Sequence, residues 1–363
     1  MTDEKQATAN GLEDVIAAET RLSKVDGQAG ELIIGGYPVE RLAAERSFEQ
    51  VWHLLFHGEE LSDDELKELR ADLAQRRRSA FERLRGRSGV HLEHPMDALR
   101  ASLAGFSTTG DLEHDAREMV AAVPVANAFW WHAQSGRRPT VPTLSDGHAA
   151  SYLRMLTRED VPEAAARALE KYLVTVSDHG LNASTFTARV IASTHSDLVS
   201  AVVGAVGALK GPLHGGAPGP VLDMLDAIED SGAPEAWIRA ELDAGRRIMG
   251  MGHRVYRVRD PRAAVFEDAL AELATAGLAS RRVELAREVE SVAEQVLAER
   301  YPDRRLKANV EFYTAVLLEA VGVPRELFSA TFAVGRMAGW TAHVKEQHET
   351  GRLIRPRSRY VGD

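Results

Sequence analysis

The helical pattern of this 363-residue chain breaks most clearly at residues 211–220, which read Gly-Pro-Leu-His-Gly-Gly-Ala-Pro-Gly-Pro. Glycine and proline are unfavourable in helix interiors, so this stretch predicts a junction between two domains. The histidine in it, His214, is flanked by glycines that let a ligand approach the backbone closely. Taken alone, the segment fits two interpretations equally: a hinge that contains a histidine, or a site at which His214 acts on a bound substrate.

On both sides of the break, apolar residues recur with helical spacing. Residues 62–65 read Ser-Asp-Asp-Glu, the form of a capping box, and predict a helix that runs to about Arg85. Further helices are predicted at 48–56, 112–133, 162–176, 234–249, 282–297, 310–321 and 324–344. A short extended run at 31–34 is followed by two glycines and predicts a small hairpin. The fold class is therefore all-α, with a short N-terminal β-hairpin.

Composition excludes several classes of function. The net charge is −10, which disfavours nucleic acid or an anionic membrane as the main partner. The chain has no cysteine, so disulfides, thiolate nucleophiles and cysteine-bound metals are ruled out. The longest run of small apolar residues, 201–209, is far shorter than the roughly 20 residues that span a bilayer. We expect a cytoplasmic protein.

Two further segments carry candidate site residues. Residues 250–256 place His253 after small residues, and Asp260 and Pro261 then form the start of a helix with Arg262 in its first turn. There the guanidinium and nearby backbone N–H groups could hold a carboxylate. A solvated surface arginine is the commoner case for any single arginine.

Glu311 follows Asn309, a good helix cap, and the helix dipole would favour an ionised carboxylate suited to act as a base. An acidic residue in a first turn more often only stabilises the helix. Arg336 lies between two glycines in an otherwise apolar helix, which is costly unless an anion accompanies the charge. That anion is either a bound carboxylate or the partner in a buried ion pair. No metal-ligand spacing such as H-E-x-x-H occurs among the 13 histidines.

Taken in order, these segments resemble the citrate synthase family across nearly the whole chain. No single motif is specific to this family, but the ordered series of motifs is. Its members are Gly11-Leu12-Glu13, Leu22-Ser23-Lys24-Val25-Asp26-Gly27, His94-Pro95-Met96-Asp97, Asp178-His179-Gly180-Leu181-Asn182-Ala183-Ser184-Thr185, Leu213-His214-Gly215-Gly216-Ala217, Gly252-His253-Arg254-Val255-Tyr256, Asp260-Pro261-Arg262, Asn309-Val310-Glu311-Phe312-Tyr313, Gly335-Arg336 and Arg355-Pro356-Arg357.

The resemblance implies a nearly all-helical homodimer. Its large domain would comprise residues 1–213 and 318–363, and its small domain residues 214–317. Closure of the small domain onto the large one would bury the substrates, with the Gly/Pro segment as hinge.

The resemblance also implies the reaction, which is condensation of oxaloacetate with acetyl-CoA and water to give citrate and CoA. Glu311 would take a proton from the thioester methyl group while His214 stabilises the developing oxygen, and His253 would polarise the oxaloacetate carbonyl. The ligands of oxaloacetate would be His179, Arg262, Arg336 and Arg355, the last from the other subunit. Contacts to CoA would come from Arg257 and Lys307. Neither a metal nor a tightly bound cofactor is implied; acetyl-CoA is a co-substrate.

One position departs from the family pattern. Where Glu311 stands the family usually has Asp, and the extra methylene extends the carboxylate by roughly 1.5 Å. A misplacement of 1 Å can cost on the order of 100-fold in rate. We expect a compensating shift of the backbone. The alternatives are a 2-methylcitrate synthase that uses propionyl-CoA, and a weakly active paralogue that binds the ligands without turning them over.

Overall fold

The computed structural model describes residues 11–12, 15–215, 218–252, 260–278, 281–304 and 306–362. Within these ranges it contains fifteen α-helices, two short 3-10 helices and one three-stranded sheet. The prediction of an all-α protein with a small N-terminal hairpin is confirmed. None of the described helices is both long and apolar enough to cross a membrane.

The sheet consists of β1 (Ser23–Asp26), β2 (Glu31–Ile34) and β3 (Tyr37–Pro38), paired antiparallel in that order. Alternate residues of β2, Leu32 and Ile34, are fully buried, which fixes the register of the sheet against the helices. The turn after β2 requires glycine at Gly35, where φ is +57° and a Cβ would lie 2.8 Å from Leu54.

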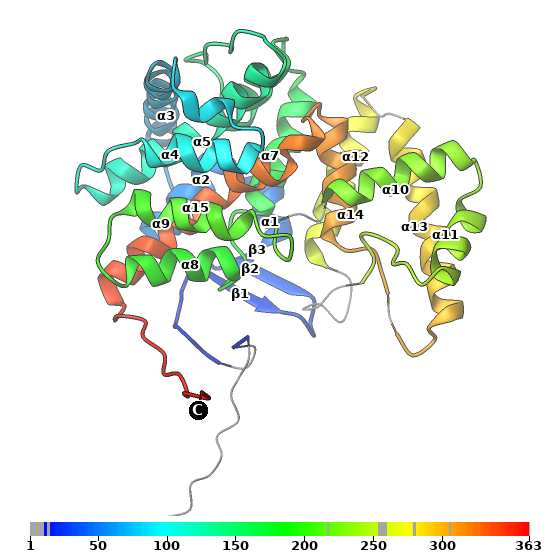
Figure 1. Cartoon of the computed structure of the whole chain (residues 1–363). Helices are drawn as coiled ribbons and strands as arrows, with labels where there is room; N and C mark the ends of the chain where they lie inside the picture. The colour runs from blue at the N-terminus through cyan, green and yellow to red at the C-terminus, as the bar shows by residue number, and fades with distance from the viewer. Residues whose placement is uncertain are drawn as a thin grey trace, which may run out of the picture.

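Helix α15 (Phe328–Thr350) runs through the larger part of the molecule and has most of its residues buried (Figure 1). The other elements of this larger group are α1 (Val39–Glu45), α2 (Phe48–His57), α3 (Asp63–Leu84), η1 (Ser88–His91), α4 (Pro95–Ala104), α5 (Leu112–Gln134), α6 (His148–Thr157), α7 (Glu163–Thr175), α8 (Ala183–Ala192), α9 (Leu198–Leu209) and η2 (Arg325–Leu327). Of these, α2, α4, α5, α7, α8 and α9 pack directly against α15.

Two glycines of α15 let the segment that follows α7 approach closely. A Cβ on Gly335 would lie 2.5 Å from Val176, and one on Gly339 would lie 2.4 Å from the Ser177 carbonyl oxygen. The Gly339 N–H donates to that oxygen at 2.9 Å. Close packing at this point sets Arg336, which lies between the two glycines, beside the 176–178 segment.

The other helices form a second group at one side of the molecule (Figure 1). They are α10 (Pro218–Ser231), α11 (Pro234–Asp243), α12 (Pro261–Thr275), α13 (Arg281–Arg300) and α14 (Val310–Ala320). Helices α12 and α14 also contact α7 of the larger group. Buried Lys171 on α7 links the groups, because its Nζ pairs with Asp268 at 2.5 Å and with Glu272 at 2.9 Å on α12. The domain boundaries at 213/214 and 317/318 stay a prediction.

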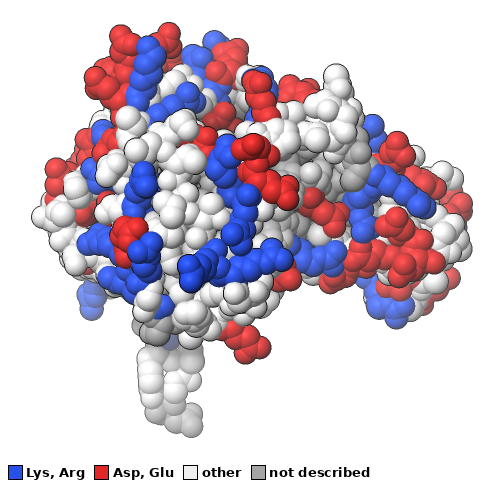
Figure 2. Space-filling view, turned by 90° about the horizontal axis from the view of Figure 1, so that it is seen from above, with Lys and Arg blue, Asp and Glu red and all other residues white. Residues whose placement is uncertain are grey.

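The cap residues that the sequence predicts at the N-termini of three helices are confirmed. The capping box at Ser62 is present, and Asp260 and Asn309 cap α12 and α14. The helix predicted at 234–249 was wrong at its C-terminal end, because α11 ends at Asp243 and Gly245 adopts φ +74°. Acidic and basic side chains both occur on the face in Figure 2, with basic side chains forming a band across its middle.

Candidate active site

His214 lies in the turn between α9 and α10, where the sequence predicted a break. Its Nε2 is 2.8 Å from the Ser184 hydroxyl near the start of α8, and that hydroxyl also accepts a hydrogen bond from the Trp340 indole of α15 at 3.2 Å. Burial, and then the positive charge of Arg336, lower the pKa of His214 to about 4. The imidazole is therefore neutral at pH 7.

Ser184 has one proton and two acceptors in reach. In this structure it donates to Asn182 Oδ1 at 2.8 Å, which leaves His214 Nε2–H as the donor to Ser184. If the hydroxyl turns to His214 instead, the imidazole carries its proton on Nδ1 and can donate to a ligand there. The local network thus permits either neutral tautomer of His214.

Arg336 is fully buried on α15. Its Nε donates to the Val176 carbonyl at 2.6 Å, and its guanidinium lies 4.5 Å from the centre of the Phe332 ring. Burial lowers the pKa of Arg336 to about 10, partly offset by the negative charge of Asp178. The guanidinium remains charged at pH 7 and has no salt bridge within 4 Å among the described residues. The sequence left two candidates for the anion that accompanies Arg336, a bound carboxylate and the partner in a buried ion pair. The buried ion pair is not found among the described residues.

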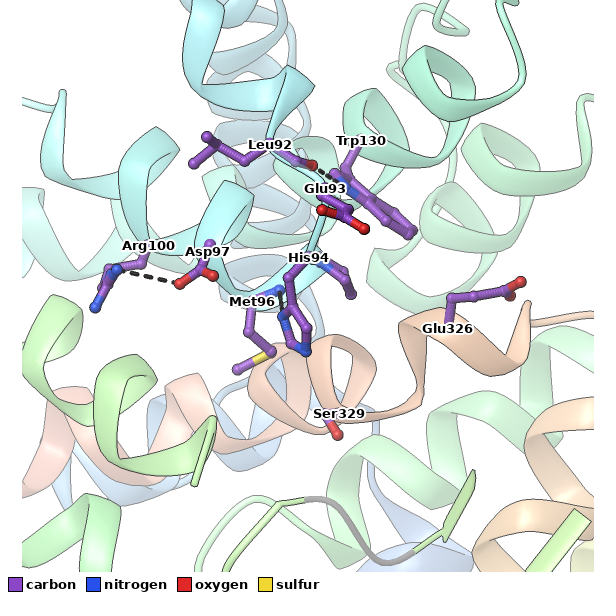
Figure 3. A pocket seen from close by; sticks show the side chains of 10 residues that line it. Leu92, Glu93, His94, Met96, Asp97, Arg100, Trp130, Glu326 and Ser329 are labelled. Atoms are coloured by element: carbon purple, nitrogen blue, oxygen red, sulfur yellow. Dashed lines mark hydrogen bonds and ion pairs between the residues drawn. The ribbon is translucent and has the colours of Figure 1, made fainter. Parts of the chain in front are cut away.

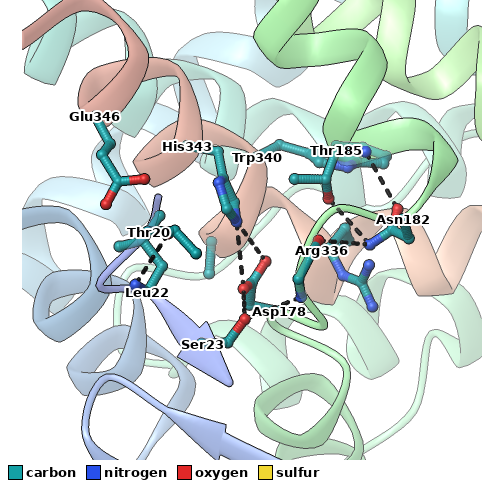
Figure 4. Close-up of polar contacts among 12 residues, drawn as sticks. Thr20, Leu22, Ser23, Asp178, Asn182, Thr185, Arg336, Trp340, His343 and Glu346 are labelled. Atoms are coloured by element: carbon teal, nitrogen blue, oxygen red, sulfur yellow. Dashed lines mark hydrogen bonds and ion pairs between the residues drawn. The ribbon is translucent and has the colours of Figure 1, made fainter. Parts of the chain in front are cut away.

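Asp178 instead belongs to a series of polar side-chain contacts close to Arg336 (Figure 4). It accepts from the Ser23 hydroxyl at 2.5 Å and from His343 Nε2 at 3.2 Å. On the other side of the ring, Arg189 donates to His343 Nδ1 at 2.8 Å and pairs with Glu346 at 2.6 Å.

Arginine carries no acceptor, so the His343 proton must lie on Nε2. Burial works against ionisation of Asp178, but the nearby His343, Arg336 and Ser23 outweigh it and lower its pKa to about 2. This series of contacts therefore holds a fixed negative charge next to Arg336.

Glu311 lies in the first turn of α14, where its backbone N–H donates to the side chain of the cap residue Asn309 at 3.0 Å. The Asn309 amide in turn donates to the Gly252 carbonyl at 2.7 Å. Glu311 is half-buried, and loss of solvation raises the pKa of its carboxyl to about 7, against the opposing effect of Arg262. A carboxyl with such a pKa is a more effective base at neutral pH than an ordinary one.

Arg262 is buried in the first turn of α12 and pairs in a two-pronged contact with Asp260, at 3.0 and 2.8 Å. The interpretation as a solvated surface arginine is wrong. The Arg262 backbone N–H also donates to Asp260, at 3.0 Å, so it is already taken by the cap rather than left for a ligand.

The segment that precedes His253 is clamped to the entry of α14. Gly252 donates to the Lys307 carbonyl at 2.7 Å, and Asn309 donates to the Gly250 carbonyl at 2.8 Å. Gly250 has φ +75°, and a Cβ on it would lie 2.8 Å from Phe312, so no larger residue fits. His253 and Arg257 themselves lie outside the described residues. The Lys307 ammonium is paired with Glu294.

The two remaining residues predicted to bind oxaloacetate are His179 and Arg355. His179 is half-buried directly after Asp178, in the connection between α7 and α8. Arg355 is exposed in the C-terminal segment and lines a cavity of about 510 Å³ together with residues near the N-terminus, such as Leu12 and Val15. Among the described residues, no hydrogen bond or salt bridge joins Arg355 to Arg336 or its neighbours.

The most spacious of the described cavities, about 900 Å³, is elsewhere. It is an open depression over the start of α4, lined by His94, Trp130, Glu326 and their neighbours (Figure 3). Its edge residue Ser329 donates to the Gly215 carbonyl, one residue beyond His214. No candidate site residue lines this depression.

His214, Arg336, Arg262 and Glu311 lie close enough for their charges to act on one another in pairs. The charge of Arg336 acts on His214, Arg262 acts on Arg336, and Arg262 acts on Glu311. These residues come from four separate parts of the chain, two in each helical group. A neutral imidazole, a carboxyl that titrates near pH 7 and two buried guanidinium groups therefore converge where the groups of helices meet.

A family model described as "Citrate synthase, C-terminal domain" matches residues 11–357, which include every candidate residue of this site. The chain belongs to the citrate synthase family. It is therefore an acyltransferase. A citrate synthase from Haloferax volcanii is 39% identical, with 97% of this chain and 95% of that protein covered. A 2-methylcitrate synthase from Mycobacterium tuberculosis is 36% identical, with 99% and 92% covered.

Among solved structures, the chain is similar to a citrate synthase from Thermoplasma acidophilum, crystallised as a ternary complex with carboxymethyl coenzyme A and oxaloacetate. The TM-score is 0.85 at 29% identity, and the match covers 97% of this chain and 96% of that one. The family and fold are thus established, while relatives named citrate synthase and 2-methylcitrate synthase match to nearly the same degree.

Proposed function

We propose that this citrate synthase family member condenses oxaloacetate with acetyl-CoA and releases citrate and CoA. The observation that carries the proposal is the grouping of a neutral His214, held at 2.8 Å from the Ser184 hydroxyl, with a Glu311 carboxyl of pKa about 7, each influenced by a buried arginine. Forming a carbon nucleophile beside a thioester requires a base and a donor to the thioester oxygen at the same time.

In the proposed reaction, the Glu311 carboxylate takes a proton from the methyl carbon of the thioester. His214 donates a hydrogen bond from Nδ1 to the thioester oxygen, while Ser184 donates to its Nε2. The resulting enolate, stabilised by the hydrogen bond from His214, attacks the oxaloacetate carbonyl, whose oxygen receives a proton from His253. Water then hydrolyses the citryl thioester and CoA leaves as the thiol. No tightly bound cofactor is needed.

Oxaloacetate carries two carboxylates, for which we propose His179, Arg262 and Arg336 as ligands. Arg336 supports this role because its buried guanidinium has no carboxylate in salt-bridge contact among the described residues and is held in place through Val176 and Phe332. Arg262 would share its guanidinium between Asp260 and the substrate. Arg257 and Lys307 are proposed to contact CoA.

We propose that the active form is a homodimer that supplies Arg355 from the partner subunit. The exposed position of Arg355, remote in its contacts from Arg336, supports a role outside its own subunit's site. The Gly/Pro segment around His214 is proposed as the hinge on which residues 214–317 close over the substrates.

Acyl preference is the first test of the proposal. We expect a higher specificity constant for acetyl-CoA than for propionyl-CoA with the purified enzyme and saturating oxaloacetate. One methylene is worth about 10- to 200-fold in a fitted pocket. A preference of more than about tenfold for propionyl-CoA would make the protein a 2-methylcitrate synthase. Oxaloacetate binding without release of CoA from either thioester would instead favour the ligand-binding paralogue.

The pH dependence tests the base. Glu311 must be ionised, and its pKa is about 7, so we expect kcat/KM for acetyl-CoA to fall about tenfold per pH unit below that value. Ionisation of His214 should cause no further change in kcat/KM between pH 5 and pH 8, because its pKa is about 4. The measurement is a pH profile of CoA release at acetyl-CoA concentrations below KM. A value of kcat/KM that stays level from pH 8 down to about pH 5 would contradict the assignment of Glu311.

A further inference from the structure

Tyr172, on α7, is a buried tyrosine whose hydroxyl has no hydrogen-bond partner among the described residues. Its side chain has an exposed fraction of 0%. A buried hydroxyl without a partner is unfavourable, because the group has lost its water and gained nothing in return. Such a group in a native protein therefore calls for a partner.

Nearby Tyr152 provides a direct contrast. It is equally buried, on α6, but its hydroxyl is 2.9 Å from the Thr331 hydroxyl and accepts from the Asn127 amide at 3.4 Å. The Tyr152 hydroxyl thus has hydrogen-bond partners inside the core, whereas the Tyr172 hydroxyl has none among the described residues. The residues around Tyr172 indicate which partner it could take.

Helix α7 contacts both α12 and α14 of the second helical group, and Tyr172 lies at this junction. Its ring packs against Phe266 of α12, with ring centres 5.4 Å apart. The charged groups that act on it are Glu311 of α14, Arg336 of α15 and Arg262 of α12, with Tyr152 as a further titratable neighbour. Apart from Tyr152, these are among the residues of the proposed active site. The unpartnered hydroxyl therefore lies close to the residues of the proposed active site.

We propose that, in the substrate-occupied enzyme, the Tyr172 hydroxyl donates a hydrogen bond to the Glu311 carboxylate and positions this base. The inference rests on the proposed function of Glu311. Glu311 is the charged group with the largest effect on Tyr172, ahead of both arginines, and arginines cannot accept a hydrogen bond. Among the described residues, the Glu311 carboxylate makes no hydrogen bond to a side chain and the Tyr172 hydroxyl has no partner, so both groups can form the proposed contact.

The contact would restrain the longer side chain of Glu311. A glutamate has one more rotatable bond than the aspartate usual in the family, and each added rotamer spreads the base over more positions. A phenol that holds one carboxylate oxygen leaves the other to face the thioester methyl group. It also stabilises the ionised form, against the burial that raises the Glu311 pKa to about 7. Arg262 acts in the same direction and Asp260 in the opposite one.

Tyr172→Phe tests the inference, because it removes the hydroxyl and keeps the ring that packs on Phe266. Loss of the donor destabilises the carboxylate and raises its pKa, so the acid limb of the kcat profile should move up by about one pH unit. On the plateau, kcat should fall about three- to tenfold, while KM for oxaloacetate stays within about twofold.

The matched control is Tyr152→Phe, which deletes a hydroxyl that is already satisfied within the same core. It should cost thermal stability without moving the acid limb. An unmoved limb in Tyr172→Phe, or a limb that moves equally in both variants, would overturn the proposal. So would a rise in KM for oxaloacetate with kcat unchanged, which would assign the hydroxyl to the substrate.

A second readout separates this inference from the proposed function. The Glu311 carboxyl can be titrated by carbon-13 NMR of the glutamate-labelled full-length protein with oxaloacetate bound, and assigned by its loss in Glu311→Gln. Tyr172→Phe should raise that titration midpoint by about one unit even if no turnover occurs. An unchanged midpoint would reject the contact, whereas a shifted midpoint in an inactive protein would reject only the proposed reaction.

Discussion

Replacing Glu311 with glutamine is expected to lower kcat by about 10²- to 10⁴-fold, the range that a positioned base contributes. Glutamine keeps the length and the hydrogen-bonding shape of the side chain but cannot take a proton. The affinity for oxaloacetate should change little, because Glu311 is not among its proposed ligands. The measurement is steady-state CoA release, with oxaloacetate binding followed separately by calorimetry.

Fold stability provides the control for this variant. The carboxyl has its pKa raised from 4.5 to about 7, so ionisation costs folding free energy as pH rises through that window, and the cost is fully present above it. Glu311→Gln should therefore be no less stable than the wild type at pH 8. Glu311→Asp should retain part of the activity. Activity of Glu311→Gln within about threefold of the wild type would remove Glu311 from the mechanism.

Replacing His214 with alanine is expected to lower kcat by about 10²- to 10³-fold, the loss typical of one donor to a developing oxyanion. The neutral imidazole held by Ser184 is the group placed to donate, and alanine leaves that position empty. KM for oxaloacetate should rise far less than kcat falls. The readout is the same CoA-release assay at saturating concentrations of both substrates.

His91→Ala is a suitable control, since His91 is exposed in η1 and has no assigned role. It should behave as the wild type. If His214→Ala keeps its kcat and loses only affinity for oxaloacetate, His214 is a substrate ligand and not the oxyanion donor.

Much of the fold follows from local sequence. Cap residues at Ser62, Asp260 and Asn309 fix helix starts by hydrogen bonds within a few residues, so they can be read from the sequence alone. The end of α11 was harder, because apolar spacing continues past Asp243 while the backbone turns at Gly245. Packing of α15 on residues 176–178 depends on two glycines whose partners lie far away in sequence.

The candidate site likewise contains residues that the local sequence indicates and others that only the fold brings together. His214, Glu311 and Arg336 stand out in sequence as unusual residues in their local setting. The chain of Asp178, His343 and Arg189 did not stand out, because His343 lies 165 residues from Asp178 and 154 from Arg189. Tyr172 was also missed. An unpartnered hydroxyl is a property of the folded core and leaves no local sequence signal.

Oxaloacetate-dependent release of free CoA from acetyl-CoA tests the central claim most directly. The purified full-length protein is mixed with acetyl-CoA and a thiol reagent, and oxaloacetate is then added. We predict no release of CoA before oxaloacetate is added and steady release afterwards. In a parallel assay of Glu311→Gln, the rate of release should be about 10²- to 10⁴-fold lower. Release that does not depend on oxaloacetate, or binding of oxaloacetate with no release from acetyl-CoA, would contradict the assignment.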